Sequence, residues 1–247
     1  MKRGQHFLKD KRFIIKIINS ALLDKKDIVL EIGCGYGNLT YEIAKRVKKI
    51  YAIEIDNELI EKAKEKLKKF NNVILVEGDI LLYKIPKEVN KIVTNPPFEI
   101  TSFLIDLFIK FLCNQGDLVV TTLQKEIFDK LIAKPGDRNF SSLSILCEKY
   151  VTIDYLGRIP RRAFSPPPKV DVVLLRMKPK TKKWEPLFNF FVRLLFMKRN
   201  RKIKYIIKHW NLSLNIPQEI ENKKCFMLNL DEINYLYEQW LRSGKLS

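Results

Sequence analysis

Asn95, Pro96, Pro97 and Phe98 combine a carboxamide, two rigid turn formers and an aromatic ring directly after an apolar run at residues 91–94. Each proline restricts its own φ, lacks a backbone N–H and favours extended geometry in the residue before it. The turn therefore presents the Asn95 amide, free proline carbonyls and the Phe98 ring. This set suits a planar base with an exocyclic amine, whose two N–H bonds go to the Asn95 oxygen and a proline carbonyl while Phe98 stacks on the ring. The alternative is a proline-rich loop whose phenylalanine belongs to the core.

A second candidate site is the glycine-rich turn at residues 33–37, Gly-Cys-Gly-Tyr-Gly. It lies between a strand expected at residues 27–32 and a helix expected at residues 38–47. Glycines let the backbone of such a turn approach a ligand closely, so we expect Gly33 and Gly35 to contact one. The spacing G-x-G-x-G differs from the dinucleotide fingerprint G-x-G-x-x-G, so the turn alone identifies no ligand.

Two carboxylates follow the next two expected strands. Glu54 lies near the end of the strand at residues 50–55, about 20 residues beyond the first glycine, where related folds place the carboxylate that binds a ribose diol. Asp79 follows the strand at residues 73–76 and is placed to accept a hydrogen bond from an adenine amine, with Ile80 packing on the ring. The alternatives are a helix-capping or surface carboxylate for Glu54 and a helix N-cap for Asp79.

Alternating strand and helix patterns must position these residues, and they predict an α/β fold with a Rossmann-like sheet. The first four strands end in the glycine turn, Glu54, Asp79 and Asn95. Because ligands bind at the carboxyl ends of strands in open α/β sheets, we expect these groups to form one site. The expected strands are 27–32, 50–55, 73–76, 90–94, 117–123, 151–157 and 170–177, and the expected helices are 12–22, 38–47, 57–70, 100–112, 124–133 and 141–150.

The composition favours a soluble protein with a polyanionic partner. The chain has 247 residues, 46% of them hydrophobic, which suits one large domain with an appendage. A net charge of +18 indicates a polyanion, nucleic acid first, although a lysine-rich proteome would also raise it. Residues 176–247 hold 16 Lys and Arg against 6 Asp and Glu, so this part of the chain is the most basic.

A basic linker at residues 178–183 separates two expected domains, a catalytic domain at 1–178 and a basic helical RNA- or ribosome-binding domain at 179–247. Helices are expected at residues 184–197, 205–210 and 231–241, the last with Asp231 as a plausible N-cap. A basic run and a stiff proline-rich segment at residues 159–169 are candidates for phosphate contacts, against the alternatives of a solvated face and a rigid connector. The candidate RNA-binding residues are Arg161, Arg162, Lys169, Lys198, Arg199, Arg201 and Lys202.

Cysteine and histidine usage argues against a metal site. The four cysteines are scattered without a C-x-x-C pair, and the chain has two histidines, so we expect no metal and buried free thiols in a reducing compartment. No signal peptide and no membrane-spanning run is seen, which predicts a cytoplasmic protein. No oligomer signal is visible, and we expect a monomer. The basic N-terminal segment before the first helix is either a solvated arm or a flap over a ligand.

Several of these motifs together resemble the KsgA-type adenine dimethyltransferases of small-subunit ribosomal RNA, relatives of the Erm enzymes that modify large-subunit rRNA. The matching segments are Gly-Gln-His-Phe-Leu at residues 4–8, residues 31–40 around the glycine turn, 54–56, 78–79 and 95–98. The chain departs from the family pattern at His6, which is commonly asparagine, at Cys34, usually proline, and at Pro96, usually leucine or isoleucine. Residues 137–144 and 196–202 resemble the KsgA branch more than Erm, whereas 164–171 is shared by both.

The resemblance implies a class I methyltransferase sheet with a small α-helical C-terminal domain, and S-adenosylmethionine as the cofactor. It implies dimethylation at N6 of two adjacent adenines in the 3′-terminal hairpin loop of small-subunit rRNA, during ribosome biogenesis. The alternatives are an Erm-like large-subunit enzyme, a DNA adenine methyltransferase and a largely non-catalytic small-subunit assembly factor. The implied catalytic residues are Asn95, Pro96, Pro97 and Phe98, and the implied cofactor-binding residues are His6, Leu8, Gly33, Gly35, Glu54, Asp79, Ile80 and Asn95.

Overall fold

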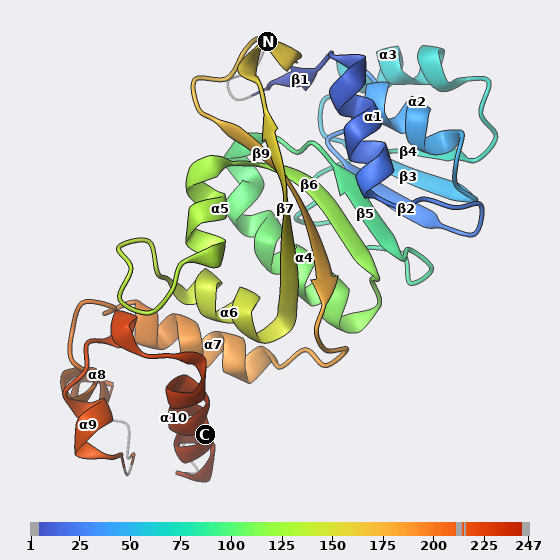
Figure 1. The fold of residues 1–247 in the computed structure, drawn as a ribbon. Coiled ribbons are helices and arrows are strands. Elements are labelled where there is room, and N and C mark those ends of the chain that lie inside the picture. The colour runs from blue at the N-terminus through green and yellow to red at the C-terminus, as the bar shows by residue number, and fades with distance from the viewer. Residues whose placement is uncertain (1–4, 211–213, 215, 244–247) are drawn as a thin grey trace. The chain divides into compact units, whose positions relative to one another are not determined.

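The computed structural model describes residues 5–210, 214 and 216–243. Its centre is a seven-stranded sheet of order β4-β3-β2-β5-β6-β9-β7 (Figure 1). The strands β4, β3, β2, β5 and β6 run parallel, and β9 pairs antiparallel with β6. This arrangement confirms the predicted Rossmann-like fold. The strands are β2 (Ile28–Ile32), β3 (Lys49–Glu54), β4 (Val73–Glu77), β5 (Lys91–Thr94), β6 (Leu118–Gln124), β7 (Val151–Ile159) and β9 (Val172–Pro179).

Helices cover the sheet because their apolar residues recur on one face. In α1 (Lys11–Ser20), Asp10 caps the first turn, and the buried face carries Ile14, Ile17 and Ile18. These side chains join residues of α2, β2, β6 and β9 in one core cluster. The buried residues of α4, which contacts β6 and β9, lie outside that cluster, so helices pack on both faces. The remaining helices up to residue 150 are α2 (Asn38–Ala44), α3 (Asn57–Leu67), α4 (Thr101–Asn114), α5 (Lys125–Ile132) and α6 (Ser142–Tyr150), of which α6 belongs to the second unit described below.

A small ladder that the sequence pattern did not predict joins two distant segments. The strand β1 (Phe7–Leu8) pairs antiparallel with β8 (Phe164–Ser165), and the N–H of Lys9 donates to the Ala163 carbonyl over 2.9 Å. The short helix η2 (Arg161–Ala163) precedes β8. The N-terminal segment is therefore fixed against the proline-rich segment.

The described residues form two compact units, one within residues 5–128 and 152–182 and the other within residues 129–151 and 183–243. In the second unit, Pro186 begins α7, where its missing N–H costs no helical bond. Asn229, and not Asp231, caps α10: it accepts from the Glu232 N–H, and Glu232 accepts from the Asn229 N–H. Asp231 lies inside the first turn, so that expectation is wrong. The elements here are α6, α7 (Pro186–Phe196), α8 (Ile203–His209), α9 (Gln218–Glu221), η3 (Cys225–Met227) and α10 (Leu230–Arg242).

Aromatic rings form the core of this second unit. Phe191 stacks on Trp240 with ring centroids 5.2 Å apart, and Phe188 meets Tyr237 edge-on at 5.1 Å. The Lys149 ammonium lies 3.9 Å from the Phe188 centroid.

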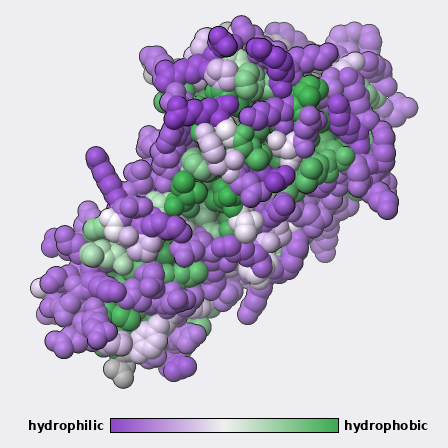
Figure 2. Space-filling view, in the orientation of Figure 1, coloured by the Kyte–Doolittle hydropathy of each residue, from purple (hydrophilic) through white to green (hydrophobic). Residues whose placement is uncertain are grey.

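The surface view shows that hydrophilic side chains cover most of the visible face of the molecule (Figure 2).

Neither a metal-binding cluster nor a membrane-spanning helix occurs in the part of the chain that the structure describes. No group of three His, Cys, Asp or Glu side chains is placed to hold a metal ion among the residues described. None of the described helices has the length and apolar character needed to cross a membrane. All four cysteines are free and buried.

Candidate active site

The glycine turn after β2 makes close contacts that only glycine allows. Gly33 has φ +71° and Gly35 has φ +53°, both in the left-handed region. A Cβ at Gly33 would lie 2.9 Å from Cδ of Pro97, and one at Gly35 would lie 2.9 Å from the Phe7 ring. The turn is therefore packed between the Asn-Pro-Pro-Phe segment and the N-terminal segment.

Glu54 fixes this turn from the end of β3. Its Oε2 accepts the Gly35 N–H over 2.9 Å, and its Oε1 accepts the N–H groups of Ile55 and Asp56 over 3.0 and 3.1 Å. The side chain is 6% exposed, and Asp56 is the residue that caps α3. Glu54 is thus neither a surface carboxylate nor a helix cap, and it lines both cavities described below.

Glu31 is a second buried carboxyl at this site, which the sequence reasoning missed. The Thr40 hydroxyl donates to its Oε2 over 2.6 Å. Burial raises the pKa of Glu31 to about 8, and the negative charge of Glu54 adds to the rise. Burial likewise raises the pKa of the Cys34 thiol, which argues against a reactive thiolate. The available signal for Glu31 was its place on the strand just before Ile32 and the glycine turn.

Asp79 caps a turn and not a helix. Its Oδ1 accepts the Leu81 N–H over 2.9 Å, and no helix follows it. Ile80 is 4% exposed. Together with Glu54, these residues line a cavity of about 230 Å³ whose walls are mostly apolar, including Ile32, Ile53, Ile55 and Pro97.

Asn95 is held by hydrogen bonds on both sides of its carboxamide. Its Nδ2 donates to the His6 carbonyl over 3.3 Å, and the Thr122 hydroxyl donates to its Oδ1 over 2.6 Å. Phe98 begins the short helix η1 (Phe98–Ile100), and its ring centroid lies 5.3 Å from that of His6. Thr122 was not among the predicted site residues, because nothing in the spacing of β6 connects it with position 95.

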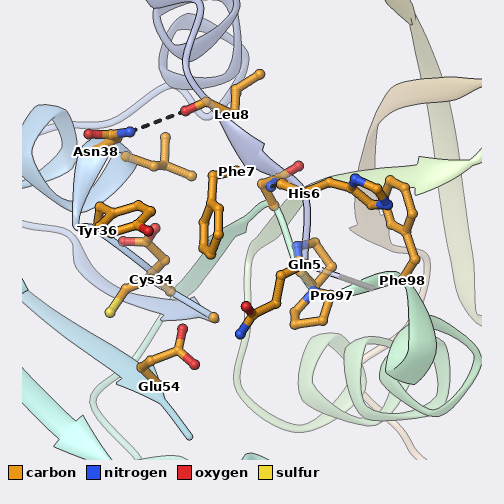
Figure 3. A pocket seen from close by; sticks show the side chains of 15 residues that line it. Gln5, His6, Phe7, Leu8, Cys34, Tyr36, Asn38, Glu54, Pro97 and Phe98 are labelled. Carbon is orange, nitrogen blue, oxygen red and sulfur yellow. Dashed lines mark hydrogen bonds between the residues drawn. The ribbon is translucent and has the colours of Figure 1, made fainter. Parts of the chain in front are cut away.

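The N-terminal segment lies over the glycine turn (Figure 3). Nδ1 of His6 is 2.8 Å from the Pro166 carbonyl, so Nδ1 carries the proton. The Leu8 carbonyl accepts from Nδ2 of Asn38 over 3.3 Å, and the Phe7 ring packs 4.7 Å from Tyr36. A cavity of about 60 Å³ lies here, and its lining includes residues 5–8, Glu31, Gly33, Cys34, Tyr36, Glu54 and residues 95–98. The predicted cofactor and catalytic residues thus line two cavities that share Gln5, Gly33, Glu54 and Pro97, except Gly35, which lies against the Phe7 ring and lines neither.

A wider hollow of about 520 Å³ opens beside Phe98. Its lining includes His6, Gln124 and Lys169. Of the three basic residues predicted in the proline-rich segment, Lys169 alone lines this hollow. Arg161 forms an ion pair with Asp171 at 2.8 Å, and Arg162 is exposed.

The basic run of the second unit divides into two kinds of side chain. Lys198 and Arg201 are exposed and line a hollow of about 250 Å³ with Tyr205, Ile206 and His209, and Lys202 is also exposed. Arg199 instead turns inward. Its Nη2 donates to the Arg138 carbonyl over 2.9 Å, and its guanidinium lies 5.4 Å from the Phe226 ring centroid.

Known proteins resemble this chain over nearly its whole length. The sequence profile described as ribosomal RNA adenine dimethylase matches residues 1–243. A probable ribosomal RNA small subunit methyltransferase A of Thermococcus sibiricus is 35% identical over 257 residues, covering 98% of this chain and 92% of the relative. A ribosomal RNA small subunit methyltransferase A of Caldanaerobacter subterraneus is 35% identical over 231 residues, covering 88% and 85%.

Two solved structures are similar in fold. A dimethyladenosine transferase from Plasmodium falciparum superposes with a TM-score of 0.82 at 26% identity, covering 97% of this chain and 98% of the other. The 23S rRNA methyltransferase ErmE superposes with a TM-score of 0.70 at 24% identity, covering 95% and 99%, which is a likeness of fold.

Proposed function

The chain belongs to the ribosomal RNA adenine dimethylase family, and from this membership we propose that it dimethylates N6 of two adjacent adenines in the 3′-terminal hairpin loop of small-subunit rRNA, with S-adenosylmethionine as methyl donor. Family membership makes it an rRNA adenine dimethyltransferase; the target adenines, the cofactor and the residue roles are the proposal. The observation that supports it best is Asn95, whose carboxamide is held beside Phe98 at a cavity that Glu54 and the glycine turn also line.

The residues around the two cavities fit this cofactor. The larger cavity has mostly apolar walls that suit an adenine ring, and we assign Asp79 to the adenine amine and Ile80 to the ring face. Glu54 is buried with lone pairs left for a ribose diol. Pro97 and the Phe7 ring leave no room for a Cβ at Gly33 and Gly35, and we assign the methionine part to the backbone of this turn. We assign His6, Leu8, Gly33 and Gly35 to the same cofactor.

When bound, the cofactor supplies a methyl group already activated on a sulfonium. The protein must then free the lone pair of the adenine amine, which is delocalised into the ring. Hydrogen bonds from N6–H to Asn95 and to a carbonyl of Pro96 or Pro97 would favour a pyramidal nitrogen. They would also stabilise its positive charge as the N–C bond forms and the bond between the methyl group and sulfur breaks, which leaves a neutral thioether. Phe98 holds the base by stacking. The proton leaves after transfer, so no dedicated base is needed before attack.

The proposed RNA target is supported by the basic charge of the chain and by the accessibility of unpaired bases in a hairpin loop. A target in a hairpin loop leaves its stack easily, because pairing is already absent there. We assign residues 1–178 to catalysis and 179–247 to RNA or ribosome binding, with phosphate contacts from Lys169, Lys198, Arg201 and Lys202. Arg161 and Arg162 are exposed and stay in this proposal, whereas the inward contacts of Arg199 favour a structural role. We place the protein in the cytoplasm as a monomer.

The test is methyl transfer from labelled S-adenosylmethionine to small subunits that lack this modification, with mapping of the modified nucleotide. We expect dimethyladenine at two adjacent loop positions. Asn95→Ala should abolish turnover and leave cofactor binding partly intact, since we assign Asn95 to the target amine as well as to the cofactor site. Label in large-subunit RNA would contradict the small-subunit assignment and favour an Erm-like target. Tight, salt-sensitive subunit binding without label would favour an assembly factor.

A further inference from the structure

Thr122 lies beside Asn95 on the neighbouring strand β6. It is fully buried, and its hydroxyl donates to Oδ1 of Asn95 over 2.6 Å. On the other side of the amide, the His6 carbonyl accepts from Nδ2 over 3.3 Å. Because a carbonyl can only accept, the amino group of the amide must face His6 and the oxygen must face Thr122. Two segments far apart in the chain therefore determine which way the Asn95 amide points.

We propose that Thr122 is a positioning residue for methyl transfer, which holds the Asn95 carboxamide with its oxygen toward the target amine. An amide oxygen has two lone pairs, so Thr122 occupies one and the second stays available for an N6–H donor. An amide rotated by 180° would present N–H groups to the amine, which is itself a donor. Without Thr122, the His6 carbonyl alone, over the longer bond, opposes that rotation. This inference rests on the role proposed for Asn95.

The neighbouring Thr121 provides a matched control. It is also fully buried on β6, but its hydroxyl donates to the Thr122 backbone carbonyl over 3.2 Å. Successive strand residues point to opposite faces of the sheet, so the Thr121 side chain is directed away from Asn95. Thr→Val at either position replaces a hydroxyl by a methyl group of similar size. Only the change at Thr122 removes the hydrogen bond to Asn95.

The first experiment measures kcat and KM for rRNA, with cofactor Kd. We expect Thr122→Val to lower kcat about 10- to 100-fold while KM and Kd change less than about threefold, because the missing hydrogen bond acts on the reacting amine. Thr122→Ser should restore most of kcat, and Thr121→Val should match the wild type. A wild-type kcat in Thr122→Val would overturn the proposal. So would an equal loss in Thr122→Ser or Thr121→Val, which would indicate packing.

The second experiment needs no activity and so separates this inference from the proposed function. In protein labelled with ¹⁵N-asparagine, the Asn95 side-chain amide pair is identified by its absence in Asn95→Ala. We expect Thr122→Val to shift or broaden that pair, with the Asn38 pair unchanged. An unchanged Asn95 pair would overturn the positioning role even if the RNA target proved different. Absence of methyl transfer by wild-type protein, with the Asn95 pair responding, would overturn the proposed function and leave only the orientation of the Asn95 amide by Thr122.

Discussion

The backbone N–H of Gly35 donates to Oε2 of Glu54 over 2.9 Å, so a carboxylate at the end of β3 holds the glycine turn that follows β2. The sequence motifs predicted a cofactor contact for each of these two residues, without connecting them to one another. The structure connects them, because the same carboxylate also accepts the N–H groups of Ile55 and Asp56. A change at Glu54 should therefore disturb the glycine turn as well as the proposed contact with a ribose.

Glu54→Gln should weaken cofactor binding. The amide group places N–H donors where the carboxylate now accepts backbone N–H bonds, and charge-assisted hydrogen bonds are removed. We expect the Kd for S-adenosylhomocysteine, measured by titration calorimetry, to rise about tenfold or more. Glu77→Gln is the control, since Glu77 pairs with Glu54 in the ladder but is exposed. Equal affinities for Glu54→Gln and wild type would remove Glu54 from the cofactor site.

Gly35→Ala should reduce both stability and cofactor affinity. The residue has φ +53°, which costs an alanine about 1–2 kcal/mol, and the new Cβ would meet the Phe7 ring at 2.9 Å. Thermal unfolding and cofactor titration measure the two effects. Gly136→Ala, with φ +91° and open space around it, isolates the backbone cost. A double variant that adds Phe7→Leu to Gly35→Ala removes the ring that the new Cβ would meet. If this double variant regained none of the cofactor affinity, the explanation by a clash with Phe7 would be wrong.

The Glu31 carboxyl should make stability depend on pH. Its pKa is raised from 4.5 to about 8 in the folded protein, so unfolding releases a proton between these values. Stability from this group is therefore present below about pH 4.5 and is lost as the pH rises toward 8, by a few kcal/mol. Glu31→Gln should flatten this fall between pH 5 and 8 in denaturant titrations. The exposed Glu65→Gln should leave it unchanged, and an equally steep fall in Glu31→Gln would contradict the assignment.

The exposed cations of the basic run should govern the salt dependence of RNA binding. Replacing Lys198, Arg201 and Lys202 by alanine should reduce the slope of log K against log salt by about 0.7 for each phosphate that is no longer neutralised. Binding to small-subunit RNA is measured by filter retention at several salt concentrations. Lys64 and Lys68, which pair with Glu61 and Glu65 on α3, are the control pair. An unchanged slope in the triple variant would place the RNA elsewhere.

Arg199→Ala should act on stability. Its guanidinium donates to the Arg138 carbonyl and packs on Phe226, so truncation removes a hydrogen bond and a ring interaction worth about 1–2 kcal/mol. We expect a lower unfolding temperature and an unchanged salt slope. Arg242→Ala, an exposed arginine of the same unit, should change neither. A reduced salt slope with normal stability would return Arg199 to the RNA-binding residues.

Local patterns in the sequence were sufficient to predict the succession of strands and helices along the chain and the glycine turn. They also predicted that Glu54, Asp79 and Asn95 lie at strand ends. Runs of apolar residues, glycines and prolines specify φ/ψ preferences over a few neighbours, and parallel strands bring their carboxyl ends to one edge. The locations of Glu54, Asp79 and Asn95 at strand ends are confirmed, and the roles of these residues in binding the cofactor and the RNA stay predictions.

Other features depend on interactions between distant segments, which no local pattern carries. The two-residue strands β1 and β8 are too short to show a period, and they pair across the chain at Phe7 and Ser165. The Thr122–Asn95 bond, the raised pKa of Glu31 and the inward turn of Arg199 arise when side chains from separate elements are packed together and shielded from water. Burial and partner geometry set hydrogen-bond direction and protonation, so these properties appear only in the folded chain.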